Sequence, residues 1–179
     1  MKVKHLVVAF LCMLGCCACS SPKTEVKSPD GHIKMTLTVD ENGTPFYNVS
    51  VNDSLLIENS KMGFVEGNGV ILGGGFRIEK TTFDSKDETW TQPWGENKTN
   101  RNHYNEMAVN LINEDQVQLT LRFRVFNDGV GFRYEYNVPN VDSLMITDEL
   151  TTFHFRQDGT SWSIPASAET YELLYKQQP

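Results

Sequence analysis

Two blocks of aromatic, amide and charged residues hold the side chains best suited to chemistry in this sequence. The first runs from Thr89 to Glu96 (TWTQPWGE) and the second from Arg101 to Glu106 (RNHYNE). Indole faces stack on the C–H surfaces of sugar rings, and guanidinium, amide and carboxylate groups hydrogen-bond their hydroxyls. The candidate carbohydrate-binding or domain-interface residues are therefore Trp94, Glu96, Arg101, His103 and Asn105.

The same residue types also fit a purely structural role, and the sequence leaves both open. Large aromatic side chains are often core residues, so Trp90 and Trp94 are alternatively expected to pack inside the domain, with Arg101, Glu96 and Glu106 in a structural polar network. Apolar and polar residues alternate little between 83 and 105, which predicts a long loop. Long loops in compact domains are usually functional or packed on a partner. We expect Glu96 and Arg101 to pair within this loop and the loop to lie at a domain interface.

Three other patterns do not indicate a catalytic or metal site. Gly73–Gly75 lacks the Gly-Lys-Ser/Thr sequence and the following helix of a phosphate-binding loop, so a turn or bulge is expected. His32, His103 and His154 lack the spacing of metal ligands. Adjacent acidic residues such as Asp87–Glu88 are typical of solvated charges. No catalytic residue and no metal ligand is assigned.

Alternation of apolar and polar residues predicts the strands that must position the two blocks. Strands are expected at 33–39, 47–51, 54–57, 107–111, 117–125 and 130–136. Asn42-Gly43 and Asp128-Gly129 stand between alternating runs, as in β-hairpins. Apolar residues show no helical spacing over a useful length. The predicted fold is all-β, an antiparallel β-sandwich.

The N-terminus has the features of an export signal. Lys2 and Lys4 precede an apolar run from Leu6 to Leu14, which is too short to span a bilayer. Ala18-Cys19, followed by two serines and a proline, fits a lipidation site. Cleavage before the cysteine of Gly15-Cys16, or cleavage without lipid attachment, are the alternatives.

These features divide the chain into a lipoprotein signal peptide at 1–18, a tether at 19–28 and one domain at 29–179. We expect an exported bacterial lipoprotein of the periplasm or outer membrane, with the lipid as its only membrane contact. All four cysteines lie at or before Cys19, so the domain has no disulfide framework. Loss of Lys2 and Lys4 takes the net charge from −7 to −9, which disfavours nucleic acid as a partner.

The order and spacing of several sequence blocks give the chain a family resemblance. They are Ser28–Gly31 (SPDG), Glu88–Trp90 (ETW), Pro93–Glu96 (PWGE), Arg101–Glu106 (RNHYNE), Phe123–Tyr134 (FRVFNDGVGFRY), Ile146–Leu150 (ITDEL) and Trp162–Pro165 (WSIP). Over nearly all of the expected mature chain, the sequence resembles the N-terminal domain of glycoside hydrolase family 97. The PWGE and RNHYNE blocks are the specific ones.

The resemblance implies an exported enzyme with an N-terminal galactose-mutarotase-like super-sandwich, a catalytic (β/α)₈ barrel and a small C-terminal β domain. It implies hydrolysis of an α-linked glucoside or galactoside, carboxylates on the barrel that act as acid, base or nucleophile, and a calcium ion near the site. The carboxylates and the calcium ligand of the sandwich fall beyond residue 179, so none is assigned here.

On this reading the sandwich is incomplete, because Tyr171–Tyr175 is typical of a strand or connection that continues. The leading hypothesis is a non-catalytic domain that braces the barrel and contributes to the rim of its sugar site. A free-standing glycan-binding lipoprotein and a purely structural module are the alternatives.

We predict that Cys19 is acylated, because Ala18 offers a small residue to the signal peptidase and the serines that follow keep the tether accessible. Mass spectrometry of the membrane fraction identifies the modified residue. A mature N-terminus elsewhere, or a soluble unmodified chain, would contradict this prediction.

Overall fold

The computed structural model describes residues 23–67, 72–137 and 143–178, and all regular structure in these ranges is β-strand. The signal peptide and Cys19 lie outside the described residues. The strands are β1 (Glu25–Lys27), β2 (Ile33–Val39), β3 (Pro45–Val51), β4 (Ser54–Lys61), β5 (Phe64–Glu66), β6 (Arg77–Thr91), β7 (Thr99–Ile112), β8 (Gln118–Val125), β9 (Val130–Asn137), β10 (Ile146–Glu149), β11 (Ser161–Ser163) and β12 (Lys176–Gln178). No helix that is long and apolar enough to cross a membrane occurs in the described part of the chain.

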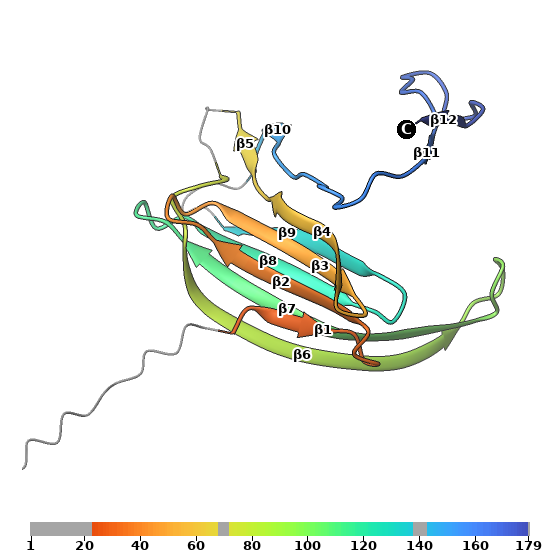
Figure 1. Cartoon of the computed structure of the whole chain (residues 1–179), viewed down its shortest axis with the longest axis horizontal. Helices are drawn as coiled ribbons and strands as arrows, with labels where there is room; N and C mark the ends of the chain where they lie inside the picture. The colour runs from red at the N-terminus through yellow and green to blue at the C-terminus, as the bar shows by residue number, and fades with distance from the viewer. Residues whose placement is uncertain (1–22, 68–71, 138–142, 179) are drawn as a thin grey trace, which may run out of the picture.

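Two antiparallel sheets form the body of the molecule. One has the strand order β1-β2-β3-β4 and the other β6-β7-β8-β9, and they lie face to face (Figure 1). Two small pairs, β5 with β10 and β11 with β12, add to this body. The predicted all-β antiparallel sandwich is confirmed.

The core fills the space between the two sheets, because the period of two directs alternate side chains inward. Met35 and Leu37 of β2 face Leu119, Leu121 and Phe123 of β8, and all five are fully buried. The intervening polar residues of these strands are directed outward, in agreement with the predicted alternation.

The predicted hairpin turn between β2 and β3 is closed by side-chain and backbone contacts. The carboxylate of Asp40 accepts hydrogen bonds from the backbone N–H groups of Asn42 and Thr44, at 3.0 and 2.7 Å. Gly43 has φ +73°, and a Cβ there would meet the backbone N of Phe76 at 2.2 Å. The glycine thus allows the turn at 73–75 to pack directly against the hairpin, consistent with the turn expected for Gly73–Gly75.

The outer edge of β4 is covered by a later part of the chain. The backbone N–H of Thr152 donates to the carbonyl of Lys61 at 2.9 Å, and Phe155 forms a bridge with Ile57. The hydroxyl of Tyr47 reaches across to the carbonyl of Thr152 at 3.0 Å. Residues 150–156 therefore protect an edge that otherwise exposes unpaired backbone groups.

The tether expected at 19–28 is wrong at its C-terminal end. Glu25–Lys27 form β1, which pairs with β2 in the register Val26↔Met35. Val26 is buried in the core, and Oγ of Ser28 accepts a hydrogen bond from the backbone N–H of Ile33. One apolar side chain among polar neighbours was too weak a sequence signal to predict this strand.

The loop expected between 83 and 105 is also wrong. β6 and β7 pair continuously from Phe83↔Met107 to Thr91↔Thr99, and only residues 92–98 connect them. The two strands continue past the sandwich as a curved, two-stranded ribbon (Figure 1). Residues 83–91 of β6 are exposed and residues 99–103 of β7 are at least partly exposed, so this part of the sequence needs no apolar alternation. That is why the pattern suggested a loop.

We predict that Leu121→Ala lowers the free energy of unfolding by about 2–5 kcal/mol, since it leaves a cavity in a fully buried site. Leu56→Ala is the matched control, because Leu56 is 46% exposed and its loss should cost about 0.5 kcal/mol or less. Urea denaturation of both variants measures the difference. Equal losses would contradict the placement of β8 in the core.

Candidate functional site

The ribbon formed by residues 83–91 of β6 and 99–107 of β7 contains or adjoins all five candidate residues. Alternation along β7 places Arg101, His103 and Asn105 on the same face as the buried Met107. At the tip, the backbone N–H of Gln92 donates to Lys98 O and its side chain donates to Asn97 O, each at 3.0 Å. The tip is therefore an ordered turn.

The two tryptophans of the ribbon are exposed. Trp94, at the tip, is 83% exposed, and Trp90, near the end of β6, is 48% exposed. The alternative in which both indoles pack in the core is wrong, because the ribbon projects beyond the facing sheet. Trp94 presents a flat apolar surface to solvent, as a sugar-stacking residue or an interface anchor must.

Arg101 pairs with Asp87 and does not pair with Glu96, contrary to the expectation from sequence. Its Nε and Nη2 atoms donate to the two carboxylate oxygens of Asp87 at 2.8 and 2.7 Å. The register places Asp87 diagonally across from Arg101 on the same face, whereas Glu96 lies in the exposed tip. The hydrogen bond from Arg101 lowers the pKa of the Asp87 carboxyl group.

The five candidates do not converge on one pocket. Trp94 and Glu96 lie at the tip, and Arg101 and His103 lie along the ribbon. Asn105 is near its base, where its Nδ2 atom donates to Lys27 O at 2.9 Å and fastens β1 to β7. They form an extended surface along one projecting element.

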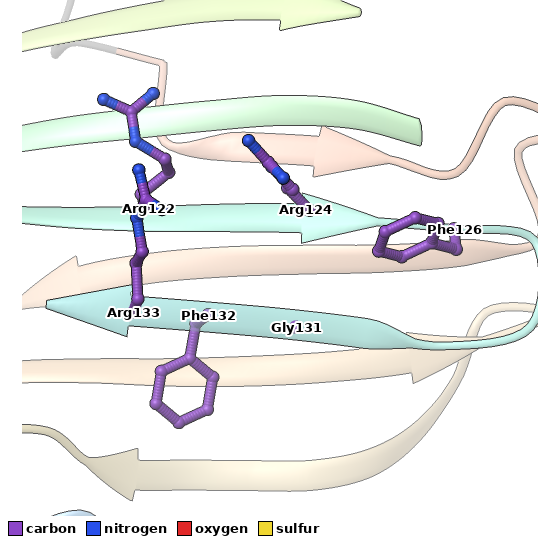
Figure 2. Close-up of a pocket in the computed structure, with 6 residues that line it drawn as sticks. All are labelled: Arg122, Arg124, Phe126, Gly131, Phe132 and Arg133. Carbon is purple, nitrogen blue, oxygen red and sulfur yellow. The ribbon is translucent and has the colours of Figure 1, made fainter. Parts of the chain in front are cut away.

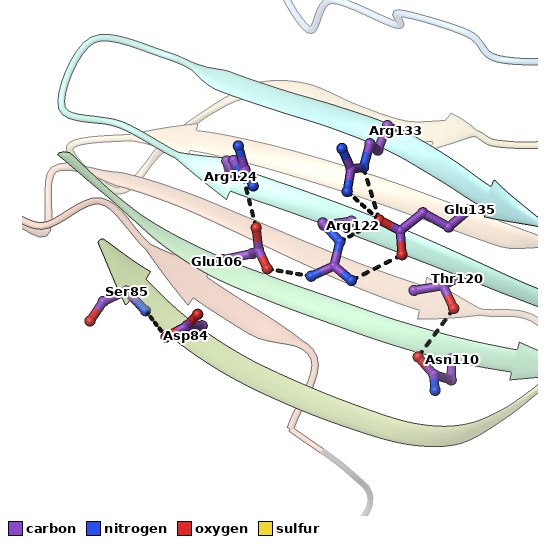
Figure 3. Close-up of polar contacts among 9 residues, drawn as sticks. All are labelled: Asp84, Ser85, Glu106, Asn110, Thr120, Arg122, Arg124, Arg133 and Glu135. Atoms are coloured by element: carbon purple, nitrogen blue, oxygen red, sulfur yellow. Dashed lines mark hydrogen bonds and ion pairs between the residues drawn. The ribbon is translucent and has the colours of Figure 1, made fainter. Parts of the chain in front are cut away.

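A second cluster, which the sequence analysis did not predict, lies on the outer face of the sheet β6-β7-β8-β9. Its centre is Glu106, a buried carboxylate on β7. Glu106 accepts hydrogen bonds from Nη1 of Arg122 and, at 2.7 Å, from Nε of Arg124 (Figure 3). Arg122 also donates to both oxygens of Glu135, at 2.6 and 2.9 Å, and Arg133 donates to one of them. We call these five residues the arginine–glutamate cluster.

The cluster keeps its carboxylates ionised. Burial by itself raises the pKa of Glu106, but hydrogen bonds from Arg124 and Arg122 outweigh this effect, and its pKa lies below the usual value. The hydrogen bond from Arg122 lowers the pKa of Glu135 to about 2, with a further contribution from Arg133. The pKa of Arg122 is raised, chiefly by its bond to Glu135.

A sequence signal for this cluster did exist. Pairing across the Asp128-Gly129 turn puts Arg122 directly opposite Arg133. Like charges in that position destabilise a sheet unless a carboxylate lies between them. Glu135, two residues beyond Arg133, is the residue that fulfils this requirement.

Metal-binding groups do not gather in the described ranges: no group of three or more His, Cys, Asp or Glu side chains there is arranged to hold an ion. Nδ1 of His32 and Oδ1 of Asn52 form a hydrogen bond at 2.7 Å, and the backbone N–H of His154 donates to the hydroxyl of Ser60.

Two facing antiparallel sheets define this chain as a β-sandwich domain. A family model for the N-terminal domain of glycosyl-hydrolase 97 matches residues 26–179. The chain therefore belongs to the N-terminal domain family of glycoside hydrolase 97 enzymes.

Individual relatives agree with this family. The chain is 27% identical over 164 residues to a retaining alpha-galactosidase of Bacteroides thetaiotaomicron, covering 91% of this chain and 23% of that protein. A family 97 enzyme from Pseudoalteromonas sp., solved in complex with panose, is 36% identical with a TM-score of 0.79. That match covers 87% of this chain and 24% of the enzyme. A beta-arabinopyranosidase, at 24% identity and a TM-score of 0.74, shares the fold. The chain thus spans about a quarter of the length of these relatives.

We predict that Glu106→Gln lowers the free energy of unfolding at neutral pH by about 1–3 kcal/mol. Removing one partner from a fully buried ion pair costs about 3–5 kcal/mol, and partial exposure of Arg122 and Arg124 reduces this figure. Glu114→Gln, in an exposed turn, is the control and should leave stability unchanged.

The pH dependence of stability is a second measure of the cluster. Since the pKa values of Glu106 and Glu135 are lower in the folded state than in the unfolded state, their stabilisation is complete above the unfolded value of about 4.3. It is lost as the pH falls through the folded values, about 2 for Glu135. Thermal unfolding between about pH 5 and 2 should show a shallower loss for Glu106→Gln than for the unmodified chain. Superimposable curves would show that Glu106 is not paired.

Proposed function

We propose that this chain is a non-catalytic N-terminal sandwich of an exported family 97 glycoside hydrolase of the α-glucosidase or α-galactosidase type. The observation that supports this most directly is the family match over 26–179 together with the share of the relatives that the chain spans, about a quarter. The related Bacteroides protein is a retaining alpha-galactosidase, and the Pseudoalteromonas enzymes were solved with panose and with acarbose. An α-linked glucoside or galactoside is the substrate class that these relatives favour.

The carboxyl groups of the described residues support a non-catalytic role. Hydrolysis of a glycosidic bond needs a carboxylic acid with a raised pKa opposite a second carboxylate. Every described carboxyl group with a resolved shift has a lowered pKa instead: Asp30, Asp87, Glu88, Glu106 and Glu135. Each of these accepts hydrogen bonds that favour its charged form.

The exposed apolar side chains near the C-terminus support a role in bracing a catalytic barrel. Trp162, Tyr171, Leu174 and Tyr175 are between 62% and 90% exposed. Soluble domains rarely leave so many large apolar side chains in contact with water within one short segment. A (β/α)₈ barrel that packs on residues 161–175 would remove them from solvent.

The ribbon is proposed to contribute to the rim of the barrel's sugar site. It projects past the sandwich and ends in the exposed Trp94, so it reaches farther than any other described element of its sheet (Figure 1). Arg101 and Asp87 form an exposed bidentate pair along it. These groups suit both a domain contact and hydrogen bonds to sugar hydroxyls.

The calcium ion implied by the family does not fit the described carboxylates. Calcium takes about 6–8 oxygen ligands, and the buried or half-buried carboxylates here are already occupied by arginines. We propose that calcium is held outside the residues described. The lipid anchor at Cys19 and location in the periplasm or outer membrane complete the proposal.

The alternative is a free-standing glycan-binding lipoprotein. The exposure of Trp94 supports it as well, because a projecting indole binds sugars without any partner domain.

We predict that the purified chain releases no aglycone from α-linked aryl glucosides or galactosides, with or without calcium. Turnover above a blank that is lost after substitution of Glu96 and Glu106 would contradict the assignment of catalysis to other domains. Turnover that persists in the substituted preparation comes from a contaminant.

In a protein that carries the barrel, we predict that Trp94→Ala and Arg101→Ala each lower kcat/KM by about 10-fold, as expected for interface anchors. Both residues are exposed in the isolated sandwich, so its melting temperature should change little. Lys86→Ala, on the opposite face of the ribbon, is the matched control. Unchanged kinetics with a lower melting temperature would support a purely structural ribbon.

A further inference from the structure

A hollow of about 210 Å³ lies on the outer face of the sheet, beside the arginine–glutamate cluster and away from the ribbon tip. Gly131 of β9 stands opposite Arg124 of β8. Since Gly131 has no side chain, the space over it is open, with Arg122, Arg124 and Arg133 directed to that side of the strands and Phe126 at the end of β8 (Figure 2). With Phe132 as the sixth lining residue, the hollow is bordered by guanidinium groups and aromatic residues.

Two carboxylates hold the guanidinium groups around the hollow in place. The buried Glu106 fixes Arg122 and Arg124, and Glu135 links Arg122 to Arg133. The guanidinium of Arg124 also lies 4.4 Å from the ring centroid of Tyr104. Because these side chains are already ordered, a ligand would not bear the full entropic cost of immobilising them.

Some guanidinium nitrogens of the arginine–glutamate cluster have no hydrogen-bond acceptor among the described residues. Among the described residues, Arg124 donates only through Nε, and Arg133 through Nε and Nη2, so the two Nη atoms of Arg124 and Nη1 of Arg133 have no acceptor. Three guanidinium groups face two carboxylates, which leaves one positive charge on a chain whose net charge is −7. A fixed guanidinium with free N–H groups is well suited to bind a carboxylate.

The ring of Phe126 limits the class of ligand that suits the hollow. Phe126 packs on Tyr104 with ring centroids 5.4 Å apart and adds an apolar surface to the hollow. A flat apolar wall suits the C–H face of a sugar ring, whereas a free inorganic anion gains nothing from it. Pockets for drug-sized ligands have volumes of about 300–1,000 Å³. The hollow is smaller, which favours a single sugar unit.

We propose that this hollow is a binding site for a uronic acid, with the carboxylate on Arg124 and Arg133 and the ring against Phe126. The site is separate from the proposed sugar-site rim and does not depend on the hydrolase function. It gives the sandwich a means to hold an acidic sugar unit of a glycan.

The test uses the isotope-labelled chain and titrations followed by NMR, with methyl α-glucuronide, methyl α-glucoside and acetate as probes. We expect methyl α-glucuronide to shift the amide signals of Phe126 and Gly131 with a Kd on the order of 1 mM. The other two probes lack either the carboxylate or the ring and should bind about 10-fold more weakly or not at all.

Gly131→Val is the decisive variant, because it fills the hollow without replacing any charged group. A Cβ at Gly131 meets nothing within 4 Å, and valine suits a strand, so the fold should persist. Affinity for methyl α-glucuronide should fall by about 10-fold or more, and Arg133→Gln should lower it as well. Gly159→Val, at an equally open position outside the sheet, is the control and should bind normally.

Three results would overturn the proposal: no shift with methyl α-glucuronide, unchanged affinity in Gly131→Val, or acetate binding as tightly as methyl α-glucuronide. None of these depends on hydrolysis, so failure here is distinguishable from failure of the proposed hydrolase role.

Discussion

The packing of one sheet's inner face against the other holds the ribbon and the arginine–glutamate cluster in position. Residues 23–178 contain no cysteine, so no disulfide supports the described fold. The fully buried side chains of β2 and β3 meet those of β7 and β8, and this contact removes the apolar face of both sheets from water. Strand register follows from it, because a slip of one residue would turn each apolar face outward.

β7 connects this core to both surfaces of functional interest. Its C-terminal half contributes the buried Met107 and Val109, and its N-terminal half continues into the ribbon. Glu106, between the two halves, points to the outer face and fixes Arg122 and Arg124. The ribbon and the arginine–glutamate cluster, the two surfaces proposed to be functional, are thus positioned by one strand.

The sequence predicted those parts of the fold in which one face is buried and the other is solvated. The strands at 33–39 and 117–125 have clear alternation because the core requires it. The ribbon was missed because its β6 strand is exposed from Phe83 to Thr91 and shows no alternation. Asp87 pairs with Arg101 through a register that alternation does not reveal. Glu106 pairs with two arginines on the neighbouring strand, and not with Arg101 as the structural alternative expected, because the pairing of β7 with β8 brings them together.

The ribbon and the exposed C-terminal segment are proposed to contact the catalytic barrel of a glycoside hydrolase. Hydrogen–deuterium exchange of the 179-residue chain and of a protein that also carries the barrel tests this most directly. We expect slower exchange at residues 83–105 and 161–175 in the longer protein, with unchanged exchange in the core strand β8. Identical exchange of the ribbon in both proteins would contradict this proposal.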